Sequence, residues 1–370
     1  MKYLNNFESY SAYKTALNNG EIATPSVSLV EGKCYYKPIV KTNFGDVAMY
    51  NKVTGDFEFC SLSAYKSEVY RDLTRKPIGV VVVPSAYTPD NTNRVMSLKN
   101  MSCKSPSTGS VSTLVRSNVV DNCDGDLNMK WGASGNIANL PNYPSVVKVN
   151  PLTGAETGTT DWMRIPSDRA WNASGYVDPI TGYRYYFNNY INDPNSSSGD
   201  KEDRFGPYPL LADGSKSPLY FRSGMATNDF NGKENTAAIL ASATVDYTRL
   251  ETIEATNTST GYYPAAFCCA RYSTIGTNPG DWYLPAQGEA SFMIAKYGMI
   301  YDTTLWLEQN LPGESIRLGR NDDTYGNWFW CSSSRSSTAA RYVNLYGGYV
   351  GDTSRSDVTA DNRVRAFLAL

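Results

Sequence analysis

The sequence predicts a mixed α+β protein that is rich in strands and turns and is divided into two parts. The chain has 370 residues, more than one compact domain usually needs. It contains 29 glycines, 19 prolines and 13% aromatic residues, a composition typical of strands joined by many turns. Apolar residues with strand spacing occur near both ends, and stretches typical of helices lie between them.

We expect residues 1–75 to form a small N-terminal β-rich domain. Residues 7–20 predict a short helix, with Ser9 as its cap and Gly20 as its stop. Residues 25–40 and 46–60 alternate apolar and polar side chains and are interrupted by glycine, which predicts hairpins. Two interpretations stay open: a simple subdomain, or a domain that attaches the chain to a larger assembly.

The remainder, residues 76–370, begins with a run of apolar residues that predicts a strand buried on both faces at 76–84. A second strand is expected at 93–102. Between about 136 and 222 the chain becomes rich in Pro, Asn, Tyr, Gly and Ser, which predicts a long loop-rich insertion.

Helices are expected after the insertion. In residues 229–245, Asn235 or Thr236 can cap a helix. Residues 262–272 predict a short buried helix. A Trp-Tyr-Leu strand at 282–284 is followed by a proline and by a helix from Ala286, with a stop expected near Gly298.

Three strands are expected to close the chain, within 340–346, 349–351 and 363–370. Gly347 and Gly348 predict a two-residue hairpin between the first two. Alternate residues of these strands should face the core and hold the sheet rigid: Val343, Leu345, Val364, Ala366, Leu368 and Leu370.

Composition also excludes several kinds of chemistry. The chain has no histidine, which removes the commonest general base and zinc ligand, and its net charge of -2 gives no reason to expect nucleic acid as a partner. Asp121, Asp124, Asp126 and Asn128 lie close together but do not have the spacing of a calcium loop. No metal and no cofactor is therefore expected.

Seven cysteines occur without a C-x-x-C pair, and we expect them to be mostly free and buried, in a protein assembled in a reducing cytoplasm. The first residues lack an apolar signal core, and no run of about 18 apolar residues occurs. Unaided secretion and membrane insertion are not expected. A virion assembled in the host cytoplasm fits both observations.

Residues 345–357, LYGGYVGDTSRSD, consist almost entirely of Tyr, Gly, Ser, Thr and Asp. Antibody loops use a similar set, because Tyr gives a large contact area at low entropic cost while Ser and Gly adapt their hydrogen bonds. The composition therefore predicts a binding surface close to strands that belong to the core. The alternative is an ordinary β edge, in which Tyr342, Tyr346 and Tyr349 pack across strands and Arg335, Arg341 and Arg355 are solvated charges.

Several segments together resemble one family. PIGVVVVP, MKWG, DFNGKENTAAIL, YYPAAFCCARY, GDWYLPAQGE, FWCSSSRSSTAARYVNL and RVRAFLAL are similar, in order and spacing, to C-type-lectin-like domains of the formylglycine-generating-enzyme type. The closest likeness is to variable proteins of diversity-generating retroelements in Bacteroides and their phages. The resemblance implies a C-type-lectin-like fold with a variable region at about 328–363. In such proteins, template adenines are copied with errors, so that Asn codons become codons for a restricted set of residues.

The resemblance and the composition together give the candidate ligand-binding residues: Arg335, Thr338, Ala339, Tyr342, Tyr346, Gly347, Tyr349, Gly351, Asp352, Thr353, Ser354, Ser356 and Asp357. The function expected is that of a phage receptor-binding protein, on a tail or head fibre at the exposed surface of the virion. Its partner would be a bacterial surface saccharide or protein. The N-terminal domain would contact other virion proteins, and a homo-oligomer such as a trimer is expected.

The alternatives are a bacterial surface adhesin of the same fold and a purely structural virion decoration protein. An enzyme is not expected. The family's namesake uses a pair of cysteines near its C-terminal end, whereas only Cys331 lies in that part of this chain. The calcium-binding motifs of the classical lectins are absent as well.

Overall fold

The computed structural model describes most of the C-terminal two thirds of the chain and part of the remainder. The described ranges are 42–67, 74–101, 113–115, 129–144, 146–149, 156–160, 163–164, 166–167, 176–177, 184–185, 226, 229–250, 252–255, 257–319, 328–345, 348–356 and 362–370. The chain divides into Met1–Thr42 and Asn43–Leu370. The helix predicted at 7–20, the hairpin at 25–40 and the acidic residues at 121–128 lie outside the described residues.

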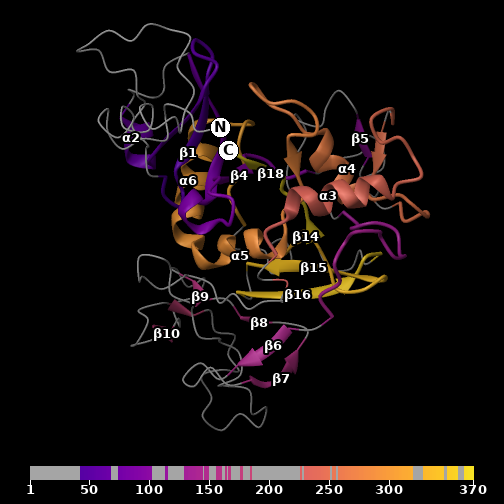
Figure 1. Ribbon diagram of the computed structural model, residues 1–370. Helices are drawn as coiled ribbons and strands as arrows, with labels where there is room; N and C mark the ends of the chain where they lie inside the picture. The colour runs from indigo at the N-terminus through magenta and orange to yellow at the C-terminus, as the bar shows by residue number, and fades with distance from the viewer. Residues whose placement is uncertain are drawn as a thin grey trace, which may run out of the picture. The chain divides into compact units, whose positions relative to one another are not determined.

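The second unit combines helices with mostly antiparallel sheets, so the predicted α+β class is confirmed at that level (Figure 1). A six-stranded antiparallel sheet has the order β13-β18-β4-β3-β1-β2. Its strands are β13 (Trp282–Tyr283), β18 (Phe367–Ala369), β4 (Arg94–Ser97), β3 (Arg75–Val83), β1 (Val47–Asn51) and β2 (Phe57–Cys60).

A five-stranded sheet has the order β17-β14-β15-β16-β8, and only the pairing of β14 with β17 is parallel. Its strands are β17 (Asn362–Arg363), β14 (Trp328–Ser334), β15 (Ala339–Asn344), β16 (Tyr349–Ser354) and β8 (Met163–Arg164). Three small sheets are formed by β5 (Thr113–Val115) with β12 (Thr252–Glu254), by β6 (Val146–Val149) with β7 (Glu156–Thr160), and by β9 (Pro166–Ser167), β10 (Tyr176–Val177) and β11 (Arg184–Tyr185).

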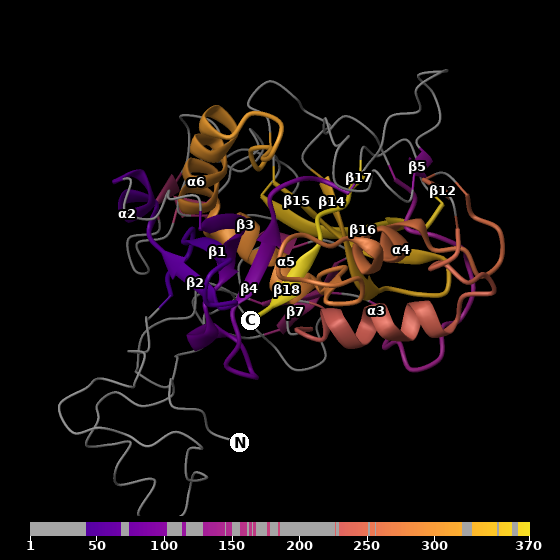
Figure 2. The ribbon, with the colours of Figure 1, turned by 90° about the horizontal axis from the view of Figure 1, so that it is seen from above.

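The helices pack against these sheets. They are α2 (Leu62–Lys66), the 3-10 helix η2 (Ser85–Tyr87), α3 (Gly232–Ala241), α4 (Pro264–Arg271), α5 (Gln287–Ala295) and α6 (Tyr297–Asn310). α5 contacts β3 of one main sheet and β15 of the other, while α6 lies on β3 and α3 packs against α4 and β14 (Figure 2). None of the described helices has the length and apolar character needed to cross a membrane.

Inner strands of both main sheets are buried on both faces. In β3, Val81 belongs to one hydrophobic cluster and its neighbours Val80 and Val82 to another. In β14, Trp330 lies in the first cluster and Phe329 in the second. Strands covered on both faces need apolar side chains at consecutive positions, which explains the unbroken run in β3 and confirms the prediction of a buried strand there.

The boundary predicted near residue 75 differs from the structure. β1 and β2 lie before that residue but pair with β3 in the six-stranded sheet, and the compact unit begins at Asn43. The hairpin signal at 46–60 is correct, because Asn51 Oδ1 accepts from Val53 N at 2.9 Å and Gly55 adopts φ +74. Local alternation predicts the hairpin but does not show which strand will pair with it, so the sequence alone does not place it in this sheet.

The end of the chain follows the predicted strands with two differences. The strand expected within 363–370 is divided into β17 and β18, which belong to different sheets. β15 pairs with β16 in an antiparallel hairpin, but four residues, not two, separate the paired Asn344 and Tyr349. Val343, Leu345, Val364, Ala366 and Leu368 are buried as expected, and Leu370 is partly buried. The intervening Arg363 and Arg365 are buried too, because this part of the chain has no solvent-facing side.

Two helix predictions need correction. α3 begins at Gly232 with Asn231 as its cap, so Asn235 and Thr236 lie inside the helix and are buried. The helix from Ala286 ends near Gly298 as expected, at Ala295, but a second helix that was not predicted, α6, starts at once at Tyr297 and contains that glycine. The predicted strand at Trp282 and Tyr283 and the helices of 262–272 and from Ala286 are confirmed.

Buried polar groups connect the elements. Glu289 of α5 accepts from Arg94 Nε of β4 at 2.6 Å, from Tyr283 Oη at 3.1 Å and from the backbone N of Ala286 at 2.9 Å. Asp229 accepts from Ser333 Oγ of β14 at 2.6 Å and from Asn235 Nδ2 of α3 at 2.8 Å. These contacts fix α3 and α5 relative to both sheets, since a buried polar group that loses its partner is costly.

Candidate functional site

The candidate site lies where β14, β15 and β16 end at a turn of small polar residues. β15 pairs with β16 from Ala339 opposite Ser354 to Asn344 opposite Tyr349. Residues 335–338, here called the polar turn, connect β14 to β15, and Arg335 N and Ser336 N both donate to Ala339 O. The sheet thus brings the polar turn beside the last residues of β16.

Arg355, which directly follows β16, holds the polar turn in place from the buried side of the sheet. Its side chain is 1% exposed, and its guanidinium lies over the ring of Trp131 at 4.4 Å from the centroid. Nη1 donates to Gly135 O at 2.9 Å, and Nη2 donates to Ser334 Oγ at 2.8 Å and Ser336 O at 2.7 Å. One cation therefore connects β16, the polar turn and the segment that follows Trp131.

Burial lowers the pKa of Arg355 to about 10, while interaction with Tyr263 opposes that shift. Among the described residues, no carboxylate forms an ion pair with Arg355. Its charge is compensated by carbonyl oxygens, a hydroxyl and the face of an aromatic ring, an arrangement that suits the planar guanidinium better than a lysine. Arg355 therefore stabilises the structure and is not a solvated charge.

Arg341 is a second buried cation, on β15 opposite Asp352 of β16. Its Nη1 donates to Asp352 Oδ1 at 3.2 Å, and its Nη2 donates to Tyr143 O. Arg335 of the polar turn reaches the other carboxylate oxygen of Asp352 at 2.8 Å. The Asp352 side chain is only 5% exposed, so this carboxylate serves mainly to neutralise two arginines.

Residues 133–144 lie beside the polar turn, although they come from a distant part of the chain. Gly135 N donates to Ser337 O at 2.7 Å, Tyr143 N to Ser334 O at 2.8 Å, and Arg335 Nε to Pro144 O at 3.0 Å. Ile137 and Leu140 of this segment are buried in the core. The insertion expected from residue 136 therefore starts with residues that belong to the framework.

An aromatic row crosses the same sheet. Trp328 of β14 stacks on Tyr342 of β15 with ring centroids 4.8 Å apart, and Tyr342 contacts Tyr349 of β16 edge-on at 6.2 Å. Trp328 and Tyr349 are partly exposed, whereas Tyr342 is buried between them. Burial, with the hydrogen bond to Tyr349, raises the pKa of Tyr342, so its phenol stays neutral.

The predicted binding residues fall into four groups. Thr338, Ser354 and Ser356 are exposed; these three are called the display positions below. Arg335, Ala339, Tyr349, Asp352 and Thr353 are partly exposed. Tyr342 and Gly351 are buried, and a Cβ added at Gly351 would lie 2.8 Å from Tyr342 Oη. Tyr346, Gly347 and Asp357 lie outside the described residues.

Two expectations are therefore wrong at the level of single residues. Tyr342 and Gly351 do not face solvent, because they lie on the side of the sheet that packs against Trp330 and the core around it. Arg341 and Arg355, solvated charges in the alternative interpretation, are buried and bonded. Composition alone missed their role, although the single arginine in a run of small polar residues is a signal that could have drawn attention to Arg355.

The structure describes four of the seven cysteines. Cys60, Cys268, Cys269 and Cys331 are free and buried, as expected, while the other three cysteines lie outside the described residues. Across the described ranges, no three acidic or cysteine side chains gather in a way that could hold a metal ion.

The chain shows no significant match to a protein-family model, to a curated protein or to a solved structure.

Proposed function

We propose that this chain is a receptor-binding protein of a phage virion, with a C-type-lectin-like fold whose C-terminal face binds a bacterial surface ligand. The observation that carries the proposal is the contrast within three consecutive residues. Ser354 and Ser356 are exposed, while Arg355 between them is 1% exposed and bonded to two distant segments, at Gly135 and at the end of β14 with the polar turn. A rigid support thus carries side chains that the core does not need.

Such a surface tolerates exchange of its exposed residues. Surface substitutions away from special contacts usually change stability by less than about 0.5 kcal/mol, whereas the loss of a buried network costs several times more. The display positions lie on the polar turn and at the end of β16, which the guanidinium groups of Arg335, Arg341 and Arg355 hold in place. A diversified binding protein needs this division between constant support and exchangeable contacts.

Binding, and not catalysis, is the activity we propose. Burial raises the pKa of the Cys331 thiol well above its ordinary value, and its side chain is fully buried. A thiol must ionise and be accessible to act as a nucleophile. Several weak contacts per particle, from a homo-oligomer carried on a fibre, would give the avidity that adsorption requires.

The binding test uses the full chain against purified capsular polysaccharides and outer-membrane proteins of Bacteroides strains. The variant Thr338→Ala/Ser354→Ala/Ser356→Ala should lose binding at least about tenfold, and Tyr349→Ala should weaken it further. The matched control Ser63→Ala/Gln309→Ala changes exposed side chains of α2 and α6 and should bind as the unchanged chain does. Equal binding by all of these proteins would place the site elsewhere.

Sequencing the gene and its neighbourhood tests diversification separately. The proposal expects a reverse transcriptase and a near-copy of the segment for residues 328–363 that differs at adenines. If neither is present, the chain is better explained as a virion decoration protein with a fixed surface.

A further inference from the structure

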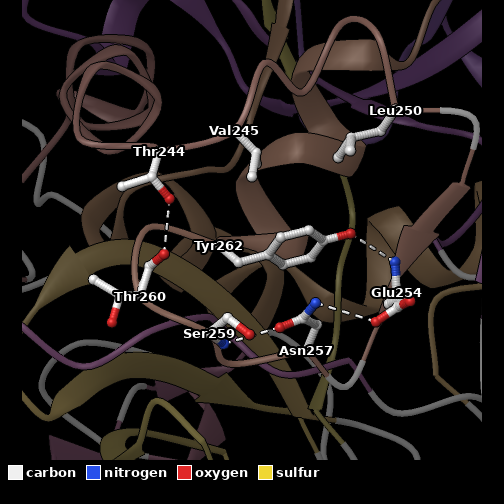
Figure 3. Close-up of a pocket in the computed structure, with 8 residues that line it drawn as sticks. All are labelled: Thr244, Val245, Leu250, Glu254, Asn257, Ser259, Thr260 and Tyr262. Atoms are coloured by element: carbon white, nitrogen blue, oxygen red, sulfur yellow. Dashed lines mark hydrogen bonds between the residues drawn. The ribbon is translucent and has the colours of Figure 1, made fainter.

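A second candidate site lies outside the C-terminal face, in the loops that flank β12. An open pocket of about 450 Å³ lies there, which is within the range of about 300–1,000 Å³ typical of small-molecule sites. Figure 3 shows the side chains that line it. Its lining comes from one continuous stretch of chain between α3 and α4: Thr244, Val245, Leu250, Glu254, Asn257, Ser259, Thr260 and Tyr262. None of these residues was among the predicted binding residues.

The ring of Tyr262 lies across the pocket and is held from both ends (Figure 3). Its Oη accepts from Glu254 N at 2.8 Å, and its ring meets Phe267 of α4 edge-on at 5.1 Å. Burial raises the pKa of Tyr262, so the phenol stays protonated. Since accepting from Glu254 N uses only a lone pair, the hydroxyl proton can still be donated to a ligand.

The acidic side of the pocket is fixed in advance. Asn257 Nδ2 donates to Glu254 Oε2 at 3.1 Å, and Asn257 Oδ1 accepts from Ser259 N at 2.9 Å. Asn257 orients the Glu254 carboxylate, which remains open to solvent because Glu254 is exposed. In the described part of the chain, the hydroxyls of Ser259 and Thr260 have no hydrogen-bond partner.

On the opposite side of the pocket, Thr244 contacts the backbone of Thr260 and Gly261 closely. Thr244 Oγ1 donates to Thr260 O at 2.8 Å, and Thr244 N donates to Gly261 O. Gly261 has φ +72, and a Cβ added there would lie 2.5 Å from Thr244 Oγ1. The two loops therefore stay in contact without a ligand, which keeps the pocket formed and lowers the ordering cost of binding.

We infer that this pocket binds a neutral pyranose. A sugar ring has hydroxyl groups at its edge and C–H groups on its faces, so it needs hydrogen-bonding groups beside apolar surface. Glu254, Asn257, Ser259 and Thr260 supply the first, while Val245, Leu250 and the Tyr262 ring supply the second. Among the described lining residues, the one charged side chain is the acid Glu254, which disfavours anionic sugars and phosphates.

The test is an NMR titration of the full chain with the methyl glycosides of glucose, galactose, mannose and N-acetylglucosamine, and with glucuronate and glucosamine as charged comparisons. At least one of them should give saturable shifts confined to residues 244–262. Glu254→Gln keeps the acceptor for Asn257 but removes the charge, and it should weaken binding about tenfold, as should Ser259→Ala/Thr260→Ala. The control Ser63→Ala/Gln309→Ala should bind unchanged.

Three outcomes would overturn the inference: no saturable shift with any of the four sugars, unchanged binding by the pocket variants, or preferential binding of glucuronate or glucosamine. The triple variant of the display positions separates this site from the proposed receptor-binding face. It should take up the sugar as the unchanged chain does, whether or not the receptor-binding proposal holds.

Discussion

The polar turn with the end of β16 and the pocket beside β12 use similar residues in different ways. At the C-terminal face, the backbone that carries the exposed Ser and Thr side chains is fixed by three arginines, whose guanidinium groups connect distant segments. At the pocket, the polar groups are fixed by neighbours within 19 residues of chain, from Thr244 to Tyr262. Exchange of residues is therefore tolerable at the first site and damaging at the second.

The difference shows which residues must stay constant for binding and which can vary. A ligand contact that also closes a loop, such as Asn257, cannot vary without changing the pocket. A contact such as Ser356 can vary, because the backbone beneath it is fixed by Arg355 N donating to Thr338 O and by the Arg355 side chain. The following predictions test the supports of the C-terminal face, from the largest expected effect to the smallest.

Asp352→Ala should have the largest effect, lowering the free energy of unfolding by about 3 kcal/mol, because it removes a nearly buried carboxylate that pairs with the fully buried Arg341. Arg335→Ala removes the other, more exposed partner of Asp352 and should cost less than about 1 kcal/mol. Urea denaturation of the two variants checks this. An equal loss in both would show that the Arg341 pair is not the support described here.

Arg355→Lys should come next, at about 2 kcal/mol, because one ammonium group cannot reach Gly135 O, Ser336 O and Ser334 Oγ together. Arg249→Lys, at an exposed arginine, is the matched control and should stay within about 0.5 kcal/mol. Hydrogen exchange at the amides of 133–135 and 335–338 should rise in Arg355→Lys alone. Unchanged exchange there would contradict the pinning role.

Gly351→Ala should cost about 1 kcal/mol, because the new Cβ would press on the phenol of Tyr342, which is stacked on Trp328. The change should also alter the near-UV circular dichroism of the aromatic row. Ser356→Thr adds a methyl group at an exposed position and serves as the control. A neutral Gly351→Ala would return this position to the set of exchangeable residues.

Thr338→Ala, Ser354→Ala and Ser356→Ala should have the smallest effects, each within about 0.5 kcal/mol, because their side chains are exposed and support no core contact. Thermal denaturation of the three single variants and of their combination measures this. A loss of more than about 1 kcal/mol in any of them would move that residue from the display positions to the framework.

Much of the fold could be predicted from local signals. The apolar run of β3, the Trp282–Tyr283 strand and the proline at the start of α4 each determine their own element. The start of α6 directly after α5 could not be predicted, because tertiary packing of Tyr297 and Ile300 outweighs the cost of a glycine in the first turn of the helix. Likewise, β1 joins β3 through a pairing that no local pattern specifies.

The site was predictable as a region but not residue by residue. The composition of 345–357 led to the end of β16, yet Tyr342 is of the same residue type as the partly exposed Tyr349 and differs from it only in how closely the core and the neighbouring rings cover it. Arg355 and Trp131 are separated by more than 220 residues in sequence, so only the fold brings them together.

The most direct test of the central claim is a comparison of two libraries under limited proteolysis. One library randomises Thr338, Ser354 and Ser356, and the other randomises Arg341, Asp352 and Arg355. We expect most members of the first library to resist the protease as the unchanged chain does, and few members of the second to survive. Equal survival in the two libraries would contradict the division between a fixed support and exchangeable contacts.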